Sequence, residues 1–463
     1  MKKSLAGNSL TPQKDYIMIE KKICGRREFL QLCVNIGIMT SFNSYAAFSC
    51  HKIKKRPNIV LILTDDQGIN DVRAYGSEIL TPHIDAIGEN GIRFINFYVT
   101  APVCTPSRFG LLTGRYQYRA AEAFQDALLP KDPDHNNVYL VKDEITIADV
   151  FKKEGYKTAL IGKWHLGHGN VEFGPNSHGF DYFYGFLPGC FDYYKHSYEI
   201  DPALHRNKTL IENEGYSTDL FTNEAIHFIE KNKNSPFFLF LSYNAPHYGR
   251  CPDGNLLQSP PELKSLPEKA VNDRAVYAAM VQNLDKGIGR IMETLSKYQL
   301  EKNTIVVFLS DNGGTYNYGG SNQPYRGQKG TLWEGGIRVP CLIKWNGHIK
   351  EGIVSDQMLI SLDLFPTLIH IAGASLPNRT LDGMNISDVL LENGILRDRY
   401  LFFKYKNQIV VRNKQWKYLK DNNEQEYLFD MINDVYEQNN VISENQFQAQ
   451  LMRAEYEKFI KSL

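Results

Sequence analysis

Short, largely apolar segments alternate with helix-like segments along most of this 463-residue chain. Residues 58–63 read Asn-Ile-Val-Leu-Ile-Leu, and residues 157–161, 237–241 and 304–309 form similar runs. A strand that is apolar at successive positions has no solvent face, which is typical of parallel strands buried between layers of helices. The alternation therefore predicts an α/β fold whose large, mostly parallel or mixed sheet is sandwiched by helices.

Helix signals separate the apolar runs. A threonine and a proline at residues 81–82 are typical of a helix N-terminus, with threonine as N-cap, and the glycines at 91 and 155 are typical stop signals. We therefore expect helices over residues 81–91, 146–154 and 273–298, and a further strand over residues 92–99.

The sequence pattern changes after about Asn385, where short alternating segments replace the long apolar runs. Such alternation is typical of antiparallel strands with two unlike faces. We expect a catalytic α/β domain over residues 50–385 and a smaller antiparallel subdomain over residues 386–463, with strands at 400–405, 409–412, 416–420 and 426–429 and a capping helix at 445–462.

The first 49 residues are typical of an export signal. Arg26-Arg27-Glu28-Phe29-Leu30 precedes a mildly apolar stretch, which resembles a Tat-type signal with Met18 as an alternative start. Cys50 follows an imperfect lipobox and is a candidate lipid anchor. No second apolar run reaches membrane-spanning length, so we expect an exported protein, periplasmic or at the cell surface.

Charge composition argues against one class of partner. The chain has 52 Lys plus Arg against 52 Asp plus Glu, so its formal net charge is zero. Proteins that bind phosphate backbones normally carry a basic surface, so the balance disfavours nucleic acid as a partner.

Unusual polar groups follow four of the predicted strands. In open α/β sheets, ligands bind beyond the carboxyl ends of the strands. Any one group also fits a turn or a solvated surface residue. Because all four occupy the same position in the fold, we predict a single site formed by Asp65-Asp66, Lys163-Trp164-His165, Asn244-Ala245-Pro246-His247 and Asp311-Asn312.

The acidic pairs predict a metal. Asp65, Asp66, Asp311 and Asn312 offer only oxygen ligands, which suit a hard cation better than zinc. Ca²⁺ is the first candidate, because adjacent carboxylates can form a crowded, irregular oxygen shell, and Mg²⁺ is the alternative.

Cys104 begins the segment Cys104-Thr-Pro106-Ser-Arg108, and Gly114 follows it. Proline in the first turn and glycine at the end predict a helix that starts at Cys104, where backbone N–H groups favour anions. Cys104 could also be a buried small residue or a thiolate nucleophile. The sequence lacks the Cys-His-Asn order of a cysteine hydrolase, which argues against a thiol acting as a thiol.

Together these segments resemble the type I sulfatases of the alkaline phosphatase superfamily. The resemblance runs from about residue 57 to 440 and includes Leu-Thr-Gly-Arg at 112–115, Gly-Lys-Trp-His-Leu-Gly at 162–167, Ala-Pro-His at 245–247, Asp-Asn-Gly-Gly at 311–314, Arg-Gly-x-Lys-Gly at 326–330 and Glu-Gly-Gly-Ile-Arg at 334–338. It implies an alkaline-phosphatase-like fold and hydrolysis of sulfate esters. It also implies that Cys104 is oxidised to Cα-formylglycine by a formylglycine-generating or anaerobic sulfatase-maturating enzyme.

The resemblance also implies a role for each site residue. Arg108 and Lys163 would orient the formylglycine, while Lys163, Lys329 and the cation would hold the sulfate. His247, helped by Lys329, would protonate the leaving alcohol, and His165 would deprotonate the second hydroxyl of the aldehyde hydrate. The cation would be held by Asp65, Asp66, Asp311, Asn312 and the formylglycine formed from Cys104.

Similarity to bacterial polysaccharide-degrading sulfatases and to N-acetylgalactosamine-6-sulfatase-like enzymes implies a sulfated glycan as substrate. The aromatic segments at 180–186 and 190–196 could line a sugar-binding cleft, or they could belong to the core. Two other functions remain open at this point: a phosphate or phosphonate ester hydrolase of the same superfamily, and a catalytically inactive glycan-binding homologue.

Overall fold

The computed structural model describes residues 56–252, 254–263 and 272–463. The predicted export signal, the alternative start at Met18 and the lipid-anchor candidate Cys50 lie outside the described residues. Within those ranges, no helix combines the length and the apolar character needed to cross a bilayer.

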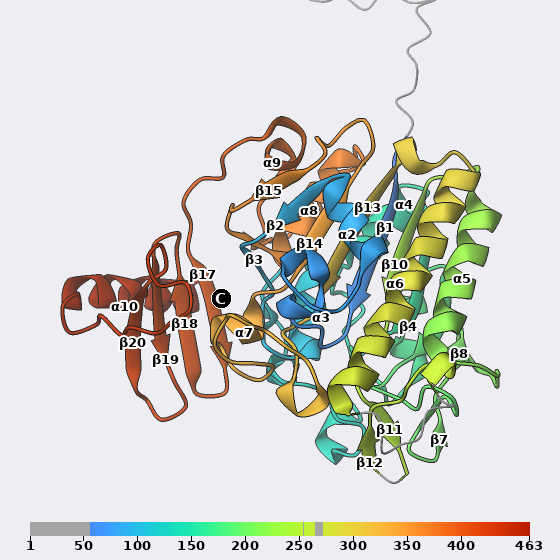
Figure 1. Cartoon of the computed structure of the whole chain (residues 1–463), viewed down its shortest axis with the longest axis horizontal. Helices are drawn as coiled ribbons and strands as arrows, with labels where there is room; N and C mark the ends of the chain where they lie inside the picture. Colours follow the sequence, from blue (N-terminus) through green and yellow to red (C-terminus); the bar gives the residue numbers. More distant parts are fainter. Residues whose placement is uncertain (1–55, 253, 264–271) are drawn as a thin grey trace, which may run out of the picture. The chain divides into compact units, whose positions relative to one another are not determined.

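A ten-stranded mixed sheet forms the centre of the protein (Figure 1). Its middle four strands are parallel and lie in the order β13 (Thr304–Ser310), β1 (Asn58–Thr64), β10 (Phe237–Ser242) and β4 (Lys157–Lys163). The other six are β5 (Tyr182–Phe186), β8 (His205–Arg206) and β9 (Thr209–Leu210) beyond β4, and β14 (Cys341–Lys344), β2 (Ile92–Phe94) and β15 (Ile353–Ser355) beyond β13. The predicted α/β class is confirmed.

Helices cover both faces of this sheet, because alternate residues of each central strand point to opposite sides. Val60 and Ile62 of β1 pack in one core with α2 (Pro82–Glu89), α5 (Ser217–Asn232) and α6 (Asp273–Lys297). Ile59, Leu61 and Leu63 pack in the other core with α3 (Cys104–Thr113), α4 (Ile147–Lys153), α8 (Leu364–Ile371) and α9 (Ser387–Glu392). The predicted helix boundaries hold to within one or two residues, with Thr146 capping α4 and Gly114 ending α3.

The strand predicted over residues 92–99 is wrong as a single element. Residues 92–94 form β2 in the large sheet, whereas β3 (Phe97–Tyr98) pairs with β16 (Leu359–Ile360) in a separate two-stranded sheet. The chain changes partner at Ile95 and Asn96, because β14 ends its pairing at Phe94. Apolar periodicity does not show where a strand changes partner.

The four C-terminal strands form an antiparallel sheet in chain order: β17 (Leu401–Tyr405), β18 (Gln408–Arg412), β19 (Trp416–Lys420) and β20 (Glu426–Asp430). Val411 and Tyr418 on one face pack against α10 (Gln446–Lys461). Val410 and Leu419 on the other face pack against residues of the large domain. The predicted small antiparallel sheet with its helix is confirmed, and the boundary at residue 385 stays a prediction.

Candidate active site

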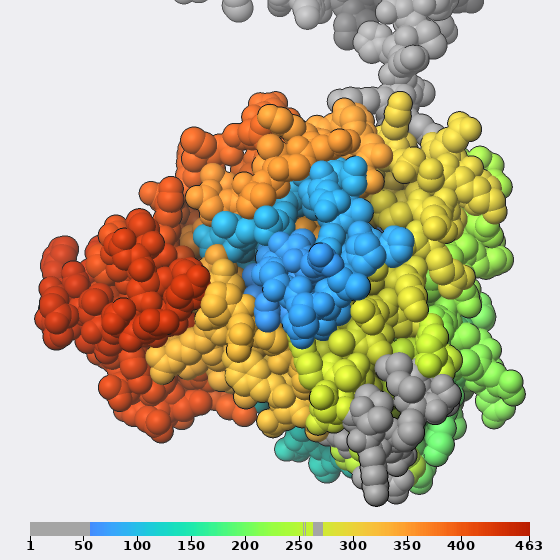
Figure 2. Space-filling view, in the orientation of Figure 1, coloured from blue at the N-terminus to red at the C-terminus, as the bar shows by residue number. Residues whose placement is uncertain are grey.

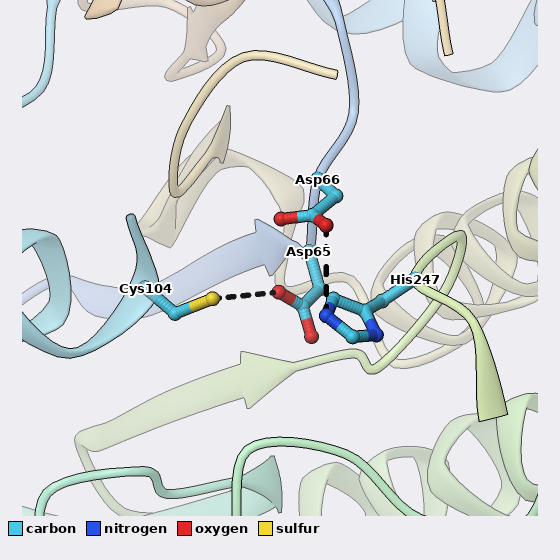
Figure 3. Close-up of side chains that lie close together, drawn as sticks. All are labelled: Asp65, Asp66, Cys104 and His247. Carbon is cyan, nitrogen blue, oxygen red and sulfur yellow. Dashed lines mark hydrogen bonds and ion pairs between the residues drawn. The ribbon is translucent and has the colours of Figure 1, made fainter. Parts of the chain in front are cut away.

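The polar groups after the four central strands lie together, as the strand order requires. Register pairs Thr64 with Ser310 and Leu63 with Ser242, so β1, β13 and β10 end side by side, and Lys163 is the last residue of the neighbouring β4. Figure 3 shows Asp65 and Asp66 beyond β1 with Cys104 and His247 directed toward them. The structure thus brings the four strand-end segments and the start of α3 to one place.

Asp65 lies among buried cations. Lys163 Nζ is 2.7 Å from Asp65 Oδ2, and Arg108 Nη2 is 3.7 Å from Asp65 Oδ1. Arg108 makes its closest ion pair with Asp311 Oδ2 at 2.8 Å, and none of these four side chains is exposed to solvent. Buried charges are stable only when they are paired, so this network holds its members in fixed positions.

Ser242 completes this network, and the sequence did not single it out. Its hydroxyl accepts a hydrogen bond from Arg108 Nη1 at 2.6 Å and donates one to the Lys163 carbonyl at 2.8 Å. Its place at the end of β10, one of the four strands with polar groups beyond their ends, was the signal that could have identified it.

Asp66 links the second half of the site. Its Oδ1 accepts a hydrogen bond from Asn312 Nδ2 at 2.8 Å, and its Oδ2 accepts one from Lys329 Nζ at 2.7 Å. His247 Nε2 lies 3.5 Å from the same Oδ2. The Asp66 backbone is in the left-handed region, with φ of 61°, and its N–H donates to Asp311 Oδ1 at 3.2 Å. This turn directs the two adjacent aspartates toward different partners.

Cys104 is the first residue of α3 and is buried. Its Sγ lies 3.6 Å from Asp65 Oδ1 and 3.5 Å from Lys329 Nζ. Burial raises the pKa of the thiol to about 12, although Lys163 and Lys329 oppose the shift. An unmodified Cys104 is therefore neutral at physiological pH, which agrees with the sequence argument against a thiolate nucleophile.

The oxygen donors of Asp65, Asp66 and Asn312 fit a hard cation. Ligand atoms of Asp65, Asp66, Cys104 and His247 all lie within 4.8 Å of one another. Asn312 Oδ1 is buried and accepts no hydrogen bond from the described residues. A buried amide oxygen without a donor is destabilising unless a cation or water satisfies it. The predicted ligand Asp311 is not in this group, and its Oδ2 accepts a hydrogen bond from Arg108 Nε at 2.9 Å.

His165 has one ring nitrogen available to take a proton. Its Nε2 lies 2.9 Å from the Leu128 carbonyl, which can only accept, so Nε2 carries the hydrogen. Its Nδ1 is buried and has no hydrogen-bond partner among the described residues. Burial and the Lys163 charge hold the pKa of His165 well below its usual range. Gly189 leaves room for the ring, since a Cβ there would lie 2.6 Å from it.

His247 has the opposite tautomer. Its Nδ1 lies 2.8 Å from the Tyr248 carbonyl and therefore carries the hydrogen, which leaves Nε2 directed toward Asp66. Burial, with the charges of Lys329 and Lys163, lowers the pKa of His247 to about 3, although Asp66 opposes the shift. His247 is thus neutral at pH 7.

A cleft of about 660 Å³ opens above these residues. Cys104, His165, His247 and Lys329 line it, and residues 127–133, Tyr198, Tyr248 and Arg250 form its sides. The aromatic segments considered from the sequence are mostly core: Phe180, Phe183, Phe186 and Phe191 are fully buried, and Cys190 alone of those segments lines the cleft. No sequence pattern marks the cleft wall at 127–133, Tyr198 or Tyr248.

Comparison with known proteins agrees with this geometry. The sulfatase family model matches residues 57–374, and a model described as the C-terminal part of N-sulphoglucosamine sulphohydrolase matches residues 327–461. The first match covers most of the chain, so the protein belongs to the sulfatase family.

Individual relatives of the chain also have sulfatase names. The chain is 34% identical over 375 residues to human N-acetylgalactosamine-6-sulfatase, covering 75% of this chain and 68% of that protein. It is 33% identical over 402 residues to mouse arylsulfatase J, covering 79% of this chain and 64% of that protein. Among solved structures, Ps i-CgsB superposes with a TM-score of 0.79 at 35% identity, covering 88% of this chain and 93% of that one.

Proposed function

We propose that this protein is a sulfuric ester hydrolase that removes sulfate from a sulfated carbohydrate. The observation that carries the proposal is the position of Cys104 at the bottom of the cleft, with Asp65 and Lys329 beside its sulfur. In a sulfatase this cysteine would be present as Cα-formylglycine, made by a formylglycine-generating or anaerobic sulfatase-maturating enzyme. When present, the hydrated aldehyde supplies one hydroxyl whose oxygen attacks sulfur and displaces the alcohol. Deprotonation of its second hydroxyl then reforms the aldehyde and breaks the carbon–oxygen bond to sulfate, which leaves.

A divalent cation, Ca²⁺ first and Mg²⁺ as alternative, would be held by Asp65, Asp66, Asp311 and Asn312. It would supply positive charge where negative charge develops on the sulfate oxygens. Support comes from the acidic cluster and from Asn312 Oδ1, which accepts no hydrogen bond from the part of the chain that the structure describes. The carboxylates of the site balance its cationic side chains, three against three: Asp65, Asp66 and Asp311 against Arg108, Lys163 and Lys329. A bound divalent ion therefore gives the site an excess of positive charge, which suits an anionic ester.

The chain's own residues then divide the work. Lys329 reaches the cleft and can hold a sulfate oxygen, while Lys163 is buried and neutralises Asp65 below. Arg108 is buried and hydrogen-bonded to Asp311 and Ser242, which hold its guanidinium in place. Cations fixed before the substrate arrives stabilise the transition state without reorganisation.

The two histidines suit opposite proton transfers: His165 can accept a proton, and His247 can donate one once it is protonated. His165 presents an unprotonated Nδ1 and suits the base that removes a proton from the second hydroxyl. His247 must first gain a proton at Nε2 to act as acid for the leaving alcohol. The negative charges of Asp66 and of a bound sulfate ester favour that protonated form.

The substrate class rests on relatives and on the cleft. Human N-acetylgalactosamine-6-sulfatase is named for a sugar substrate, and Ps i-CgsB has been solved with k-i-k-neocarrahexaose bound. The cleft volume of about 660 Å³ and the rings of Tyr198 and Tyr248 suit a sugar. Aromatic faces give such a ligand a flat apolar surface. We also propose export to the periplasm or cell surface through residues 1–49, with Cys50 as an alternative lipid anchor.

The decisive test measures both the modification and the reaction. The protein is produced with a maturation enzyme, and mass spectrometry of the peptide containing Cys104 distinguishes thiol from aldehyde. Sulfate release is then assayed on an aryl sulfate and on defined sulfated mono- and disaccharides, before and after chelation and re-addition of Ca²⁺ or Mg²⁺. Cys104→Ala should fold and lose turnover, whereas Cys341→Ala, which removes a buried thiol outside the lining of the cleft, should keep it.

Two other outcomes would favour the other candidate functions. Faster hydrolysis of aryl phosphate or phosphonate than of aryl sulfate would indicate a phosphoryl ester hydrolase. An unmodified Cys104 in protein from its own host, with glycan binding and no hydrolysis, would indicate a binding protein. Repeated sulfate release by the unmodified thiol protein would disprove the mechanism, because a thiol cannot supply the second hydroxyl.

A further inference from the structure

Residues of the C-terminal sheet contact the loop that carries Lys329. We call residues 326–333 the lysine loop. On the side of the large domain, the Lys329 N–H donates to the Gly314 carbonyl at 3.2 Å, and the Gly330 N–H donates to the Pro102 carbonyl at 2.9 Å. Figure 2 shows the red C-terminal segment against the golden segment that includes the lysine loop. The loop therefore lies between the two sheets.

Gln408, the first residue of β18, holds the loop from the side of the C-terminal sheet. Its side chain is 3% exposed. Its Oε1 accepts a hydrogen bond from the Leu332 N–H at 3.0 Å, and its Nε2 donates to the Gly330 carbonyl at 3.3 Å. One buried amide thus binds main-chain groups of both the residue after Lys329 and the residue two positions further along.

A buried ion cluster anchors the end of the loop. Lys417 Nζ in β19 lies 2.9 Å from Glu334 Oε1 and 2.6 Å from Glu437 Oε1, and none of the three side chains is exposed. Glu437 Oε2 accepts the Glu334 N–H at 2.8 Å, and the Glu437 carbonyl accepts a hydrogen bond from Arg326 Nη1 at 3.1 Å. Both ends of the lysine loop are therefore tied to the C-terminal subdomain.

Lys329 needs such support because its side chain is long. Four rotatable bonds separate its backbone from Nζ, which must lie within bonding distance of Asp66 and close to Cys104. A backbone displacement of the loop is transmitted directly to the ammonium group. Misplacement by about 1 Å can cost about 100-fold in rate when a group must meet a reacting centre.

We propose that Gln408 is a positioning residue for the reaction: its amide fixes the backbone of the lysine loop so that the Lys329 ammonium group points at the sulfate. The Lys417–Glu334–Glu437 cluster secures the same loop at its end. This inference rests on the proposed function for the role of Lys329 toward sulfate. The placement of the loop by Gln408 is a property of the chain that can be measured separately.

A double-mutant cycle tests the coupling. Gln408→Leu keeps the approximate side-chain size and removes both hydrogen bonds. We expect it to lower kcat/KM for an activated aryl sulfate by about 10- to 100-fold. In a Lys329→Ala background, the same change should have less than about a twofold effect, because there is no ammonium group left to misplace. Independent effects would multiply instead.

Val411→Ala is the matched control. Val411 lies on the opposite face of β18, in the core under α10, so its truncation destabilises the same subdomain without touching the lysine loop. It should lower the Tm and leave kcat/KM unchanged at a temperature where the protein stays folded. The inference is overturned if Val411→Ala reproduces the loss of activity, or if Gln408→Leu lowers the activity of Lys329→Ala by the same factor as that of the wild type.

Hydrogen exchange measured by mass spectrometry gives a readout that does not need turnover. Gln408→Leu should speed exchange in the peptide that contains residues 327–332 and leave peptides of β1 and β13 unchanged, whereas Val411→Ala should not affect residues 327–332. Unchanged exchange in Gln408→Leu would overturn the positioning role. If the wild type hydrolyses no sulfate ester while exchange behaves as expected, the proposed function fails and the placement of the loop by Gln408 stands.

Discussion

The two sheets of this protein use polar residues in opposite ways. In the central sheet, β1 is buried along its whole length, and its chemistry begins only after the strand ends, at Asp65 and Asp66. In the C-terminal sheet, polar residues lie within the strands: Gln408 and Lys417 are buried in the face turned toward the large domain. The central sheet carries reactive groups at its strand ends, and the C-terminal sheet holds the loop that carries Lys329.

The difference follows from strand direction. Parallel strands all end at the same edge of a sheet, so the residues that follow separate strands meet there. The strands themselves can therefore stay apolar along their whole length. An antiparallel sheet has two distinct faces with a period of two, and one of its faces can bury polar groups if each finds a partner. Substitutions at the strand ends of the central sheet should therefore affect the reactive site directly. The C-terminal sheet suits a supporting role.

The largest effect should come from Asp311→Asn at the end of β13. This change removes the charge that pairs with buried Arg108 and replaces a charged predicted cation ligand by a neutral amide. We expect sulfate release to fall by at least about 100-fold. We also expect the free energy of unfolding to drop by about 3–5 kcal/mol, because Arg108 loses its closest counter-ion. Kinetics at a permissive temperature and chemical denaturation measure the two effects.

Asp363→Asn is the control for that experiment, since Asp363 forms a comparable buried pair with Arg399 away from the cleft. It should lose similar stability and keep its activity. An equal loss of activity in both variants would mean that Asp311→Asn reports unfolding, and the contrast between strand ends and the rest of the molecule would fail.

A large effect on stability, with a smaller effect on activity, should come from Lys417→Met in the C-terminal sheet. It leaves Glu334 and Glu437 buried without their shared cation, which should cost about 3–5 kcal/mol of unfolding free energy. Lys420→Met, at the end of the same strand β19, breaks only an exposed pair with Glu424 and should cost less than about 1 kcal/mol. Urea denaturation of both variants measures the two losses of unfolding free energy. Equal losses would show that the buried cluster contributes no more to stability than the exposed pair.

The smallest effect is a pH dependence that originates in the same cluster. Burial and the nearby Glu334 raise the pKa of Glu437 to about 7, although Lys417 opposes the shift. The unfolded value is near 4.5, so between pH 4.5 and 7 the folded protein holds a proton that the unfolded chain has lost. The resulting stabilisation is complete below pH 4.5 and is lost as pH rises through 7.

Glu437→Gln should remove that dependence. The difference in unfolding free energy between this variant and the wild type should change by about 1–3 kcal/mol between pH 5 and pH 8, with the variant gaining relative stability as pH rises. Glu424→Gln, at an exposed position, should show no such change. A difference that is flat with pH would mean that Glu437 is ionised throughout this range.

The strand-end residues could be predicted because their position is a one-dimensional property. Asp65, Lys163 and Asp311 each come at or directly after an apolar run, and parallel strands guarantee that such positions meet. The start of α3 at Cys104 was similarly readable from Pro106 and Gly114. The break between β2 and β3 was not readable, because it depends on which strand lies alongside.

Side-chain partnerships across distant segments were also beyond prediction. Ser242 matters because Arg108 and the Lys163 carbonyl both reach it, and Gln408 matters because the lysine loop lies against β18. Both are ordinary polar residues with no local pattern around them. For the aromatic segments at 180–186 and 190–196, the sequence left a sugar-binding cleft and the core as alternatives, and burial places most of their rings in the core.

From the order of amino acids alone come the α/β class, the four strand-end groups, the helix that begins at Cys104 and the antiparallel C-terminal sheet, because each depends on periodicity and on signals within a few residues. Tertiary packing had to decide the tautomers of His165 and His247, the wall of the cleft and the tie between β18 and Lys329. These depend on distances between atoms far apart in the chain, and only the packed fold brings those atoms together.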